Sequence, residues 1–136
     1  MLDLPKTVVV LVEVPRFSFV KRRVDGRCVY FSPIPAPFNY GSIPTIDGGD
    51  GDPLDAVLLG PHRSRGSLQT ANVLGMVHFI DAGEIDDKVV CGTLPLRRRD
   101  WLLVNAFFIC YPLFKGPLNM LRLKRGPTRY LGWTEY

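Results

Sequence analysis

Four aspartates lie close together in the segment IDGGDGDPLD at residues 46–55: Asp47, Asp50, Asp52 and Asp55. The glycines and the proline between them disfavour a helix and favour a turn, so the carboxylates can converge. Magnesium is usually held by a few carboxylates while it keeps water and phosphate oxygens in its coordination shell. The segment therefore favours a magnesium site, with a solvated aspartate-rich turn as the alternative.

A second acidic segment, IDAGEIDDK at residues 80–88, contains Asp81, Glu84, Asp86 and Asp87. The two segments hold eight of the thirteen acidic residues, although the formal net charge of the chain is +4. Carboxylates gathered this closely repel one another unless a cation lies between them. The second cluster weakens the alternative of a solvated turn and strengthens the prediction of bound divalent metal.

Short β-branched and aliphatic segments separated by turns predict a mainly β fold. Strands are expected over 7–14, 55–60, 72–80 and 87–92, with a hairpin over 17–32 that turns at Asp25-Gly26. This spacing predicts a small OB-like five-stranded β-barrel with one or two packed helices (α+β), in a single domain of residues 1–136. Both acidic segments then lie at strand ends or in loops, where a rigid barrel presents a site.

The remaining segments are expected to form a loop, a helix and a further strand. SPIPAPFNYGSIP at 32–44 contains four prolines and predicts an ordered extended loop. Asp100 is a suitable N-cap for WLLVNAFFICY at 101–111, and Pro112 is expected to end that helix. RYLGWTEY at 129–136 has the composition of a short strand.

The sequence predicts neither a membrane segment nor a disulfide framework. No stretch reaches the roughly 18 uninterrupted apolar residues of a spanning helix. Cys28, Cys91 and Cys110 are odd in number and lack CxxC spacing, so neither disulfides nor a zinc site is indicated. We expect a soluble protein of the reducing cytoplasm with no membrane partner.

The acidic segments belong to a longer pattern that resembles the family I soluble inorganic pyrophosphatases. DGDPLDA at 50–56 looks like the signature of that family, and it is preceded by VEVPRFSFVK and SPIPAPFNYGSIP and followed by LGMVHFIDAGEIDDKVV. The similarity in order and spacing covers residues 8–92, whereas FFICY and YLGWTEY resemble only fragments of the family's C-terminal region. The chain resembles a diverged, C-terminally shortened member.

The resemblance implies hydrolysis of inorganic pyrophosphate to two phosphates by a metal-activated water held in an aspartate cluster. It implies an inorganic diphosphatase that depends on Mg²⁺, or on another divalent ion such as Mn²⁺. Similar bacterial proteins assemble as hexamers, so a homo-oligomer is expected. Metal ions suit this chemistry on general grounds, because they acidify bound water and neutralise charge on both phosphates.

The resemblance assigns metal binding to aspartates of both acidic segments. By similarity, Asp50, Asp55 and Asp86 hold the activating metal ion, and Asp55 bridges to a second ion. Asp81 binds a further ion that arrives with the substrate, helped by Asp86. Four aspartates are therefore the implied metal ligands.

The resemblance also assigns catalytic and substrate-binding roles. Asp52 is implied to orient and deprotonate the metal-bridging water, and Glu13 to support the site from the first strand. The side chains implied to contact phosphate oxygens are Lys21, Tyr40, Lys88 and Tyr111.

Three departures from the family pattern concern the binding of phosphate. Cys28 stands where the family has an arginine, and Arg27, one residue away, would point to the opposite face of a strand. Arg23 stands where the family has an acid, and we hypothesise that it reaches the substrate instead. Pro112 stands where the family has a lysine, for which Lys115 or one of residues 97–99 is the nearest substitute. Two lost charge-assisted contacts would weaken phosphate binding by about 3–6 kcal/mol.

Two other functions are compatible with parts of the sequence. A weakened pyrophosphatase-like protein could bind metal and diphosphate ligands without turnover, as the changes at Cys28 and Pro112 suggest. A basic nucleic-acid-binding barrel would suit the pI of about 9.1, the arginines at 97–99 and the RLKRGPTR segment. The second alternative leaves the aspartates unexplained, because carboxylates repel a phosphate backbone.

Overall fold

The computed structural model describes residues 4–18, 20–22, 28–31, 36–49, 51–92, 97–121 and 126–135, with the backbone alone for 20–22, 28–31, 114–121 and 135. The elements in chain order are β1 (Thr7–Val14), β2 (Val20–Arg22), β3 (Cys28–Phe31), β4 (Asn39–Asp47), β5 (Pro53–Leu58), β6 (Leu68–Asp81), β7 (Glu84–Ile85), β8 (Lys88–Gly92), α1 (Arg98–Leu121) and β9 (Arg129–Glu135).

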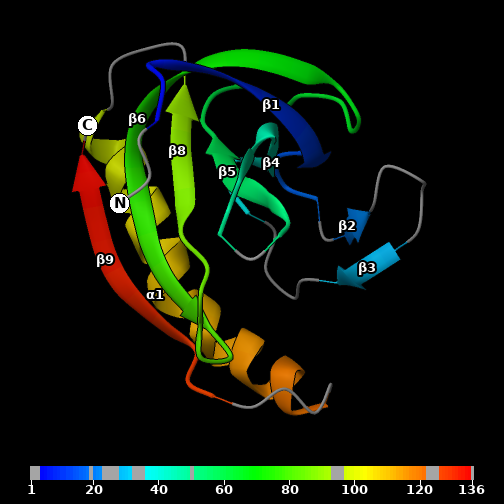
Figure 1. The fold of residues 1–136 in the computed structure, drawn as a ribbon, viewed down its shortest axis with the longest axis vertical. Helices are drawn as coiled ribbons and strands as arrows, with labels where there is room; N and C mark the ends of the chain where they lie inside the picture. The colour runs from blue at the N-terminus through cyan, green and yellow to red at the C-terminus, as the bar shows by residue number, and fades with distance from the viewer. Residues whose placement is uncertain are drawn as a thin grey trace.

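Five strands close into a barrel in the order β1-β4-β5-β8-β6, and pairing of β1 with β6 completes the circle. All these pairings are antiparallel except that of β5 with β8, which is parallel. Strands β7 and β9 extend the sheet from β6, and the β2–β3 hairpin lies to one side (Figure 1). The predicted mainly β fold with an OB-like five-stranded barrel is confirmed.

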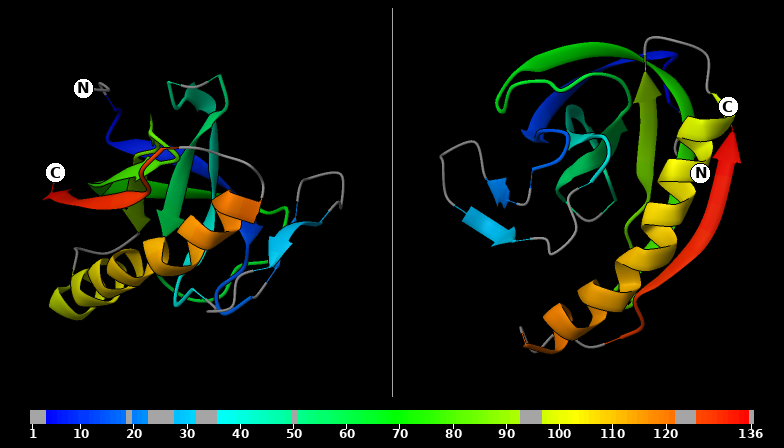
Figure 2. Two further views of the ribbon diagram at one scale, coloured as in Figure 1. Left: turned by 90° about the horizontal axis from the view of Figure 1, so that it is seen from below. Right: turned by 180° about the vertical axis from the view of Figure 1, so that it is seen from behind.

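The barrel wall separates two hydrophobic cores. Side chains alternate between the two faces of a strand, and in β1 the buried residues Val8, Val10 and Val12 belong to the core in the lumen. The second core lies between the outer face of the barrel and α1, where Phe79 and Phe108 are completely buried. Figure 2 shows α1 running across the sheet on this outer side. The helix therefore covers strands that the lumen core alone would leave half exposed.

The segment predicted as an extended loop is largely strand. Residues 39–47 form β4, which pairs with both β1 and β5, so the prediction of a loop through residue 44 was wrong. Proline is tolerated in a strand where ladder pairing is interrupted. Pro44 lies in the irregular stretch between Ile43 and Asp47, where the register with β5 shifts.

The helix is longer than predicted and does not end at Pro112. It begins at Arg98, so Asp100 lies in its first turn and is not the N-cap, and it continues to Leu121. Proline removes one helical hydrogen bond, but tertiary packing can compensate for that loss. Phe108, one turn before the proline, and Tyr111, directly before it, are both buried against the barrel and hold the helix in place.

Two shorter predictions are confirmed in outline. The β2–β3 hairpin pairs Lys21 with Tyr30, although the expected turn at Asp25-Gly26 lies outside the described residues. The C-terminal segment forms β9, which runs antiparallel to β6 and pairs Thr134 with Met76. The described residues include no helix with the length and apolar character of a membrane span.

Closure of the barrel depends on a glycine in β4. A Cβ atom at Gly41 would overlap the backbone carbonyl of Leu11 on β1. We therefore expect Gly41→Ala to lower the free energy of unfolding by about 2 kcal/mol or more, because strand backbones cannot move apart without losing their ladder. Chemical unfolding measures the change. Thr45→Ala, at an exposed position of the same strand, is the control, and an equal effect of the two substitutions would contradict this explanation.

Candidate active site

A buried lysine joins the two acidic segments. The Nζ of Lys88 donates hydrogen bonds to Oδ2 of Asp86 at 2.8 Å, to Oδ2 of Asp55 at 3.3 Å and to the carbonyl oxygen of Asp86 at 3.2 Å. An ammonium group has three donors, so these acceptors satisfy it fully. The Lys88 side chain is 2% exposed, whereas the two carboxylates are about a quarter exposed, at 24% and 26%. Solvent therefore reaches the acids but not the ammonium.

The parallel pairing of β5 with β8 creates this contact. Asp55 and Lys88 are register partners in that pair, and both side chains lie on the outer face of the barrel. Their neighbours Leu54, Ala56 and Val89 belong to the lumen core instead. The candidate site is therefore on the outer surface of the barrel, on the side that α1 covers.

Aromatic rings surround the lysine on that surface. The Lys88 ammonium lies 5.8 Å from the ring centroid of Tyr40 and 5.4 Å from that of Phe79, within the range of cation–π attraction. Tyr111 of α1 packs edge-on against Phe79, with ring centroids 5.3 Å apart. Three of the residues implied to bind phosphate, Tyr40, Lys88 and Tyr111, thus belong to one contiguous cluster around Phe79.

The charge state of Lys88 follows from these contacts. Burial by itself lowers the pKa of a lysine, because it disfavours the charged form. The negative charges of Asp55 and then Asp86, together with the hydrogen bonds to both, outweigh burial, and the pKa of Lys88 is raised above its ordinary value. The side chain is therefore an ammonium ion at neutral pH.

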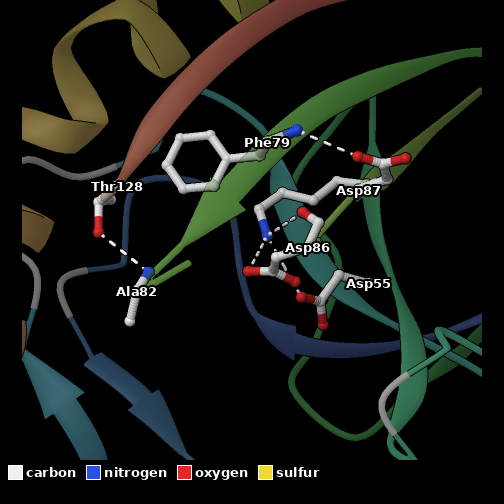
Figure 3. Close-up of polar contacts among 7 residues, drawn as sticks. Asp55, Phe79, Ala82, Asp86, Asp87 and Thr128 are labelled. Atoms are coloured by element: carbon white, nitrogen blue, oxygen red, sulfur yellow. Dashed lines mark hydrogen bonds and ion pairs between the residues drawn. The ribbon is translucent and has the colours of Figure 1, made fainter. Parts of the chain in front are cut away.

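The adjacent acid, Asp87, has a structural role. Its Oδ1 accepts the backbone N–H of Phe79 at 3.1 Å and its Oδ2 lies 3.3 Å from Nδ1 of His78. Figure 3 shows the carboxylate of Asp87 directed towards the amide of Phe79, away from Asp55 and Asp86. The backbone N–H of Asp86 also donates to the carbonyl of Phe79. These bonds fix the chain next to Lys88.

Residues of the C-terminal segment contact the turn between β6 and β7 and fix its position. Ala82 and Gly83 both have positive φ angles, 52° and 85°, as a tight two-residue hairpin requires. The backbone N–H of Ala82 donates to Oγ1 of Thr128 (Figure 3), and Gly126 packs against the same turn. The position of Asp81, the last residue of β6, therefore depends on the chain that follows α1.

Other residues implied as site members occupy the same region. Asp52 is exposed in the turn that leads into β5, and its carbonyl accepts the N–H of Gly48. Asp81 is half-buried beside that hairpin turn. Glu13 lies at the point in β1 where the register with β4 shifts, next to the pair Val14 and Tyr40. A β-bulge of this kind redirects a side chain.

The structure leaves three implied residues without a described side chain. Asp50 and Arg23 lie outside the described residues, and of Lys21 only the backbone is described. Lys115 and the arginines at 97–99 are the candidates to replace the positive charge that is missing at Pro112. Arg99 precedes Pro112 by thirteen residues, which is about 20 Å along a helix, so the arginines at 97–99 are too distant to replace the missing lysine. The side chain of Lys115 is not described.

The carboxylate oxygens of the candidate site are the type of ligand that a divalent cation prefers. Among the residues described, no three His, Cys, Asp or Glu side chains are grouped so as to hold a metal ion, and Asp50 falls outside that set. The carboxylates of Asp55 and Asp86 nevertheless converge on one cation, the ammonium of Lys88. Hard oxygen donors directed at one point are what magnesium requires. The residues present therefore fit such an ion.

Comparison with known proteins agrees with this geometry. Residues 10–99 match the family model described as inorganic pyrophosphatase. The chain belongs to the inorganic pyrophosphatase family. The resemblance seen in the sequence is thus confirmed, and the matched residues contain both acidic segments, most of β1 and the start of α1.

Curated relatives align with only part of this family member. It is 38% identical over 97 residues to an inorganic pyrophosphatase of Gluconobacter oxydans, an alignment that covers 65% of the chain and 56% of that protein. It is 37% identical over 90 residues to an inorganic pyrophosphatase of Synechocystis, covering 60% and 53% respectively. The aligned part thus spans little more than half the length of these relatives.

Solved structures share the fold over nearly the whole chain. An inorganic pyrophosphatase from Neisseria gonorrhoeae superposes with a TM-score of 0.70 at 26% identity, covering 96% of this chain and 83% of that one. A protein from Anaplasma phagocytophilum, called an inorganic phosphatase, gives a TM-score of 0.77 at 22% identity, covering 98% and 86%. The similarity includes β9 and most of α1, which lie beyond the residues that match the family model.

The Lys88 cluster of this family member makes a testable contribution to stability. We expect Lys88→Met to lower the free energy of unfolding by about 1–3 kcal/mol at neutral pH, because two carboxylates then face each other without a cation. Partial exposure of both acids keeps the cost below that of a fully buried pair.

The pH dependence of this effect follows from the raised pKa. The contribution of Lys88 is complete below the unfolded lysine pKa of about 10.4 and disappears as the pH rises through the higher folded pKa. Chemical unfolding of both proteins from neutral to alkaline pH measures this, with the exposed Lys6→Met as control. A difference between wild type and Lys88→Met that persists undiminished in strong alkali would contradict the assignment.

Proposed function

We propose that this protein hydrolyses inorganic pyrophosphate to two phosphates. Membership of the inorganic pyrophosphatase family and the names of the relatives support the proposal. The observation that carries it is the meeting of Asp55 and Asp86, from two separate acidic segments, around one cation. Carboxylates brought together on a solvent-accessible surface next to a lysine suit a substrate that is itself a strongly charged anion.

We propose that Asp50, Asp55, Asp81 and Asp86 hold divalent cations, with Mg²⁺ as the physiological ion. Bound there, such ions would acidify a water molecule and neutralise charge on both phosphates of the substrate. Asp55 and Asp86 are partly exposed and already directed at one cation, so they can exchange the ammonium of Lys88 for another positive charge. Asp81 pairs with Glu84 in the β6–β7 hairpin, two residues before Asp86.

Asp52 is proposed as the general base that orients and deprotonates the attacking water. It lies in the exposed turn before β5, three residues from Asp55, where solvent can reach it. Glu13 is proposed to support the site from β1, at the register shift opposite β4. A carboxylate within reach of water is a suitable proton acceptor in such a site.

Lys88, Tyr40 and Tyr111 are proposed to bind phosphate oxygens, together with Lys21 and Arg23. The ammonium of Lys88 has three donors that can be redirected from the aspartates to a phosphate oxygen, because such an oxygen is an equally strong acceptor. Phe79 keeps Lys88 and Tyr111 in one cluster. The lysine is therefore proposed to pass from carboxylate to substrate as the site fills.

A weakened enzyme that binds metal and diphosphate ligands is the second candidate. The observation that favours it is the place of Pro112 within α1, where proline itself brings no charge and the arginines at 97–99 lie too far along the helix. Measurements of pyrophosphate turnover and of pyrophosphate binding separate the two candidates. Release of phosphate from pyrophosphate supports the enzyme, whereas binding without release supports the alternative.

The activity of an Asp52 variant is the decisive test of the proposed hydrolysis. We expect Asp52→Asn to lower the rate of phosphate release from magnesium pyrophosphate by about 100-fold or more, because loss of a general base typically costs 10²–10⁴ in rate. Asp47→Asn is the matched control, since Asp47 lies in the same acidic segment and accepts the N–H of Gly49. Removal of divalent ions by a chelator should abolish the activity. Retention of full activity by Asp52→Asn would remove the proposed base.

We propose further that α1 mediates self-association. An apolar stripe on its free face consists of Leu102, Ile109 and Leu113, which are 56%, 57% and 77% exposed. Their spacing follows the helical repeat, so they lie on one side of the helix. An antiparallel pair of helices would bring the arginines at 97–99 next to the negative end of the partner helix. The occupant proposed for this face is therefore a second copy of the chain.

Substitution in that stripe tests the proposal. We expect Ile109→Lys together with Leu113→Lys to reduce the mass in solution to that of the monomer, because burial of two charges opposes pairing. Light scattering coupled to size exclusion measures the mass. Leu131→Lys is the control, since Leu131 is 54% exposed on β9, away from the stripe. A monomeric wild-type protein, or an unchanged oligomer in the double variant, would contradict the proposal.

The predictions of domain organisation and of location in the cell are also proposals. We infer that residues 1–136 form one pyrophosphatase-like domain, because β9 pairs with the barrel strand β6 and α1 packs on the same wall. A cytoplasmic location is suited by Cys91 and Cys110, which are free thiols.

A further inference from the structure

A cavity of about 470 Å³ lies between the barrel and the N-terminal end of α1. Its charged lining residues are Arg16, Arg97, Arg99 and Asp100. The apolar part of its wall includes Phe38, Leu59, Leu74 and Leu103. A single hollow thus offers both a cationic rim and an apolar surface, and no part of it belongs to the candidate active site.

The cavity is separated from the acidic residues along the strands. Asp55 and Lys88 form one register pair of β5 and β8, and Leu58 and Cys91 form the last one. Gly92, which lines the cavity, is four residues beyond Lys88, or about 13 Å along an extended strand. Figure 1 shows β8 running from the β7 turn towards the end of the barrel near which α1 begins. The two sites therefore face different ends of the same strands.

The charge of the lining favours an anion. Three arginines and a single acid, Asp100, are among the residues that line the cavity, so positive charge is in excess. Guanidinium groups bind phosphate through paired, parallel hydrogen bonds. The first turn of α1 adds the partial positive charge of a helix N-terminus. An oxyanion entering the cavity would meet complementary charge from two elements.

Several contacts fix the position of Arg16 at the cavity. Its backbone N–H donates to Oδ1 of Asn39 at 3.0 Å, its Nη1 donates to the carbonyl of Gly60 at 3.2 Å, and its guanidinium lies 4.8 Å from the ring centroid of Phe17. Its Nε is buried and has no hydrogen-bond acceptor among the described residues. A buried N–H without an acceptor is unfavourable. Reorientation of the Arg16 side chain towards a ligand oxygen would supply the missing acceptor.

The rim around Arg16 is organised by one buried amide. Asn39 is completely buried, and its Nδ2 donates to the carbonyl of Pro61 at 2.8 Å while its Oδ1 also accepts the N–H of Arg63 at 2.9 Å. These bonds join the segment after β1, the start of β4 and the segment after β5. A binding site built on fixed segments loses little conformational freedom when a ligand enters.

We propose that this cavity binds a small ligand that joins a phosphate group to an apolar, planar body, of the size of a nucleoside monophosphate. The arginines hold the phosphate, and the apolar wall of Leu59, Leu74 and Leu103 holds the planar body. The volume is within the range of about 300–1,000 Å³ that is usual for small-molecule sites. The proposal does not rest on hydrolysis of pyrophosphate.

Adenosine monophosphate is a suitable probe, compared with adenosine and with inorganic phosphate. Titration calorimetry is done with the full chain in the presence of a chelator, because without divalent ions the aspartates repel phosphate and only the cavity should bind. The expected result is binding of adenosine monophosphate at least 10-fold tighter than that of either fragment alone. No binding of adenosine monophosphate at millimolar concentration would overturn the proposal, as would equal affinity for it and for either fragment.

Arginine and aspartate variants locate the bound probe. The Arg97→Ala, Arg99→Ala double variant should lower the affinity for adenosine monophosphate at least 10-fold, whereas Arg98→Ala, the residue between them that does not line the cavity, should change it less than 2-fold. Asp100→Asn removes the one opposing carboxylate and should tighten binding about 2- to 5-fold.

The control variant also decides between a built site and general attraction to a basic surface. Equal losses in Arg98→Ala and in the double variant would overturn the proposal, because simple net charge would then explain the binding. Weaker binding by Asp100→Asn would overturn it as well. Unfolding midpoints of all variants show whether a loss of affinity results from a change in the cavity or from destabilisation of α1.

Discussion

The ammonium of Lys88, buried between Asp55 and Asp86, is the interaction on which the candidate active site depends. Burial of an unpaired ammonium is costly, so the lysine can occupy this position only because three oxygen acceptors surround it. In turn, two neighbouring carboxylates are tolerated because a positive charge separates them. Each group makes the position of the others possible. The cluster is consequently a cation site already, occupied by a side chain.

The barrel topology determines where this cluster can form. Asp55 and Lys88 are brought together by the parallel β5–β8 pair, and the intervening chain must cross the barrel wall as β6 and return through β7. Alternation along each strand then places the charged pair outside and Leu54 and Val89 inside. A register shift of one residue would turn Lys88 into the lumen. The apolar lumen core therefore fixes the register that the polar site needs.

Much of this arrangement could be predicted from local sequence. The strand over 7–14 has uninterrupted β-branched residues, and the two acidic segments carry their own turn residues, so both were recognised. The strand at β4 was missed because its prolines favour a loop locally, whereas pairing with two neighbours decides the structure. Continuation of α1 past Pro112 was missed for a similar reason, since buried Phe108 and Tyr111 outweigh one lost hydrogen bond. The ion pairs of Lys88 were not predictable either, because they arise from strand pairing between distant segments.

The distribution of charge matters more than the net charge. In the described structure the acids Asp55, Asp81 and Asp86 lie towards one end of the barrel strands, while Arg16, Arg97 and Arg99 line a cavity at the other. Gly92 of the cavity lies about 13 Å along β8 from Lys88, and across such a separation the arginines interact only weakly with an anion held by the acids. Positive charge for pyrophosphate must therefore come from nearby lysines and from cations bound to the carboxylates themselves. Because Pro112 cannot contribute, this family member should rely more heavily on those bound cations than one with a lysine at that position.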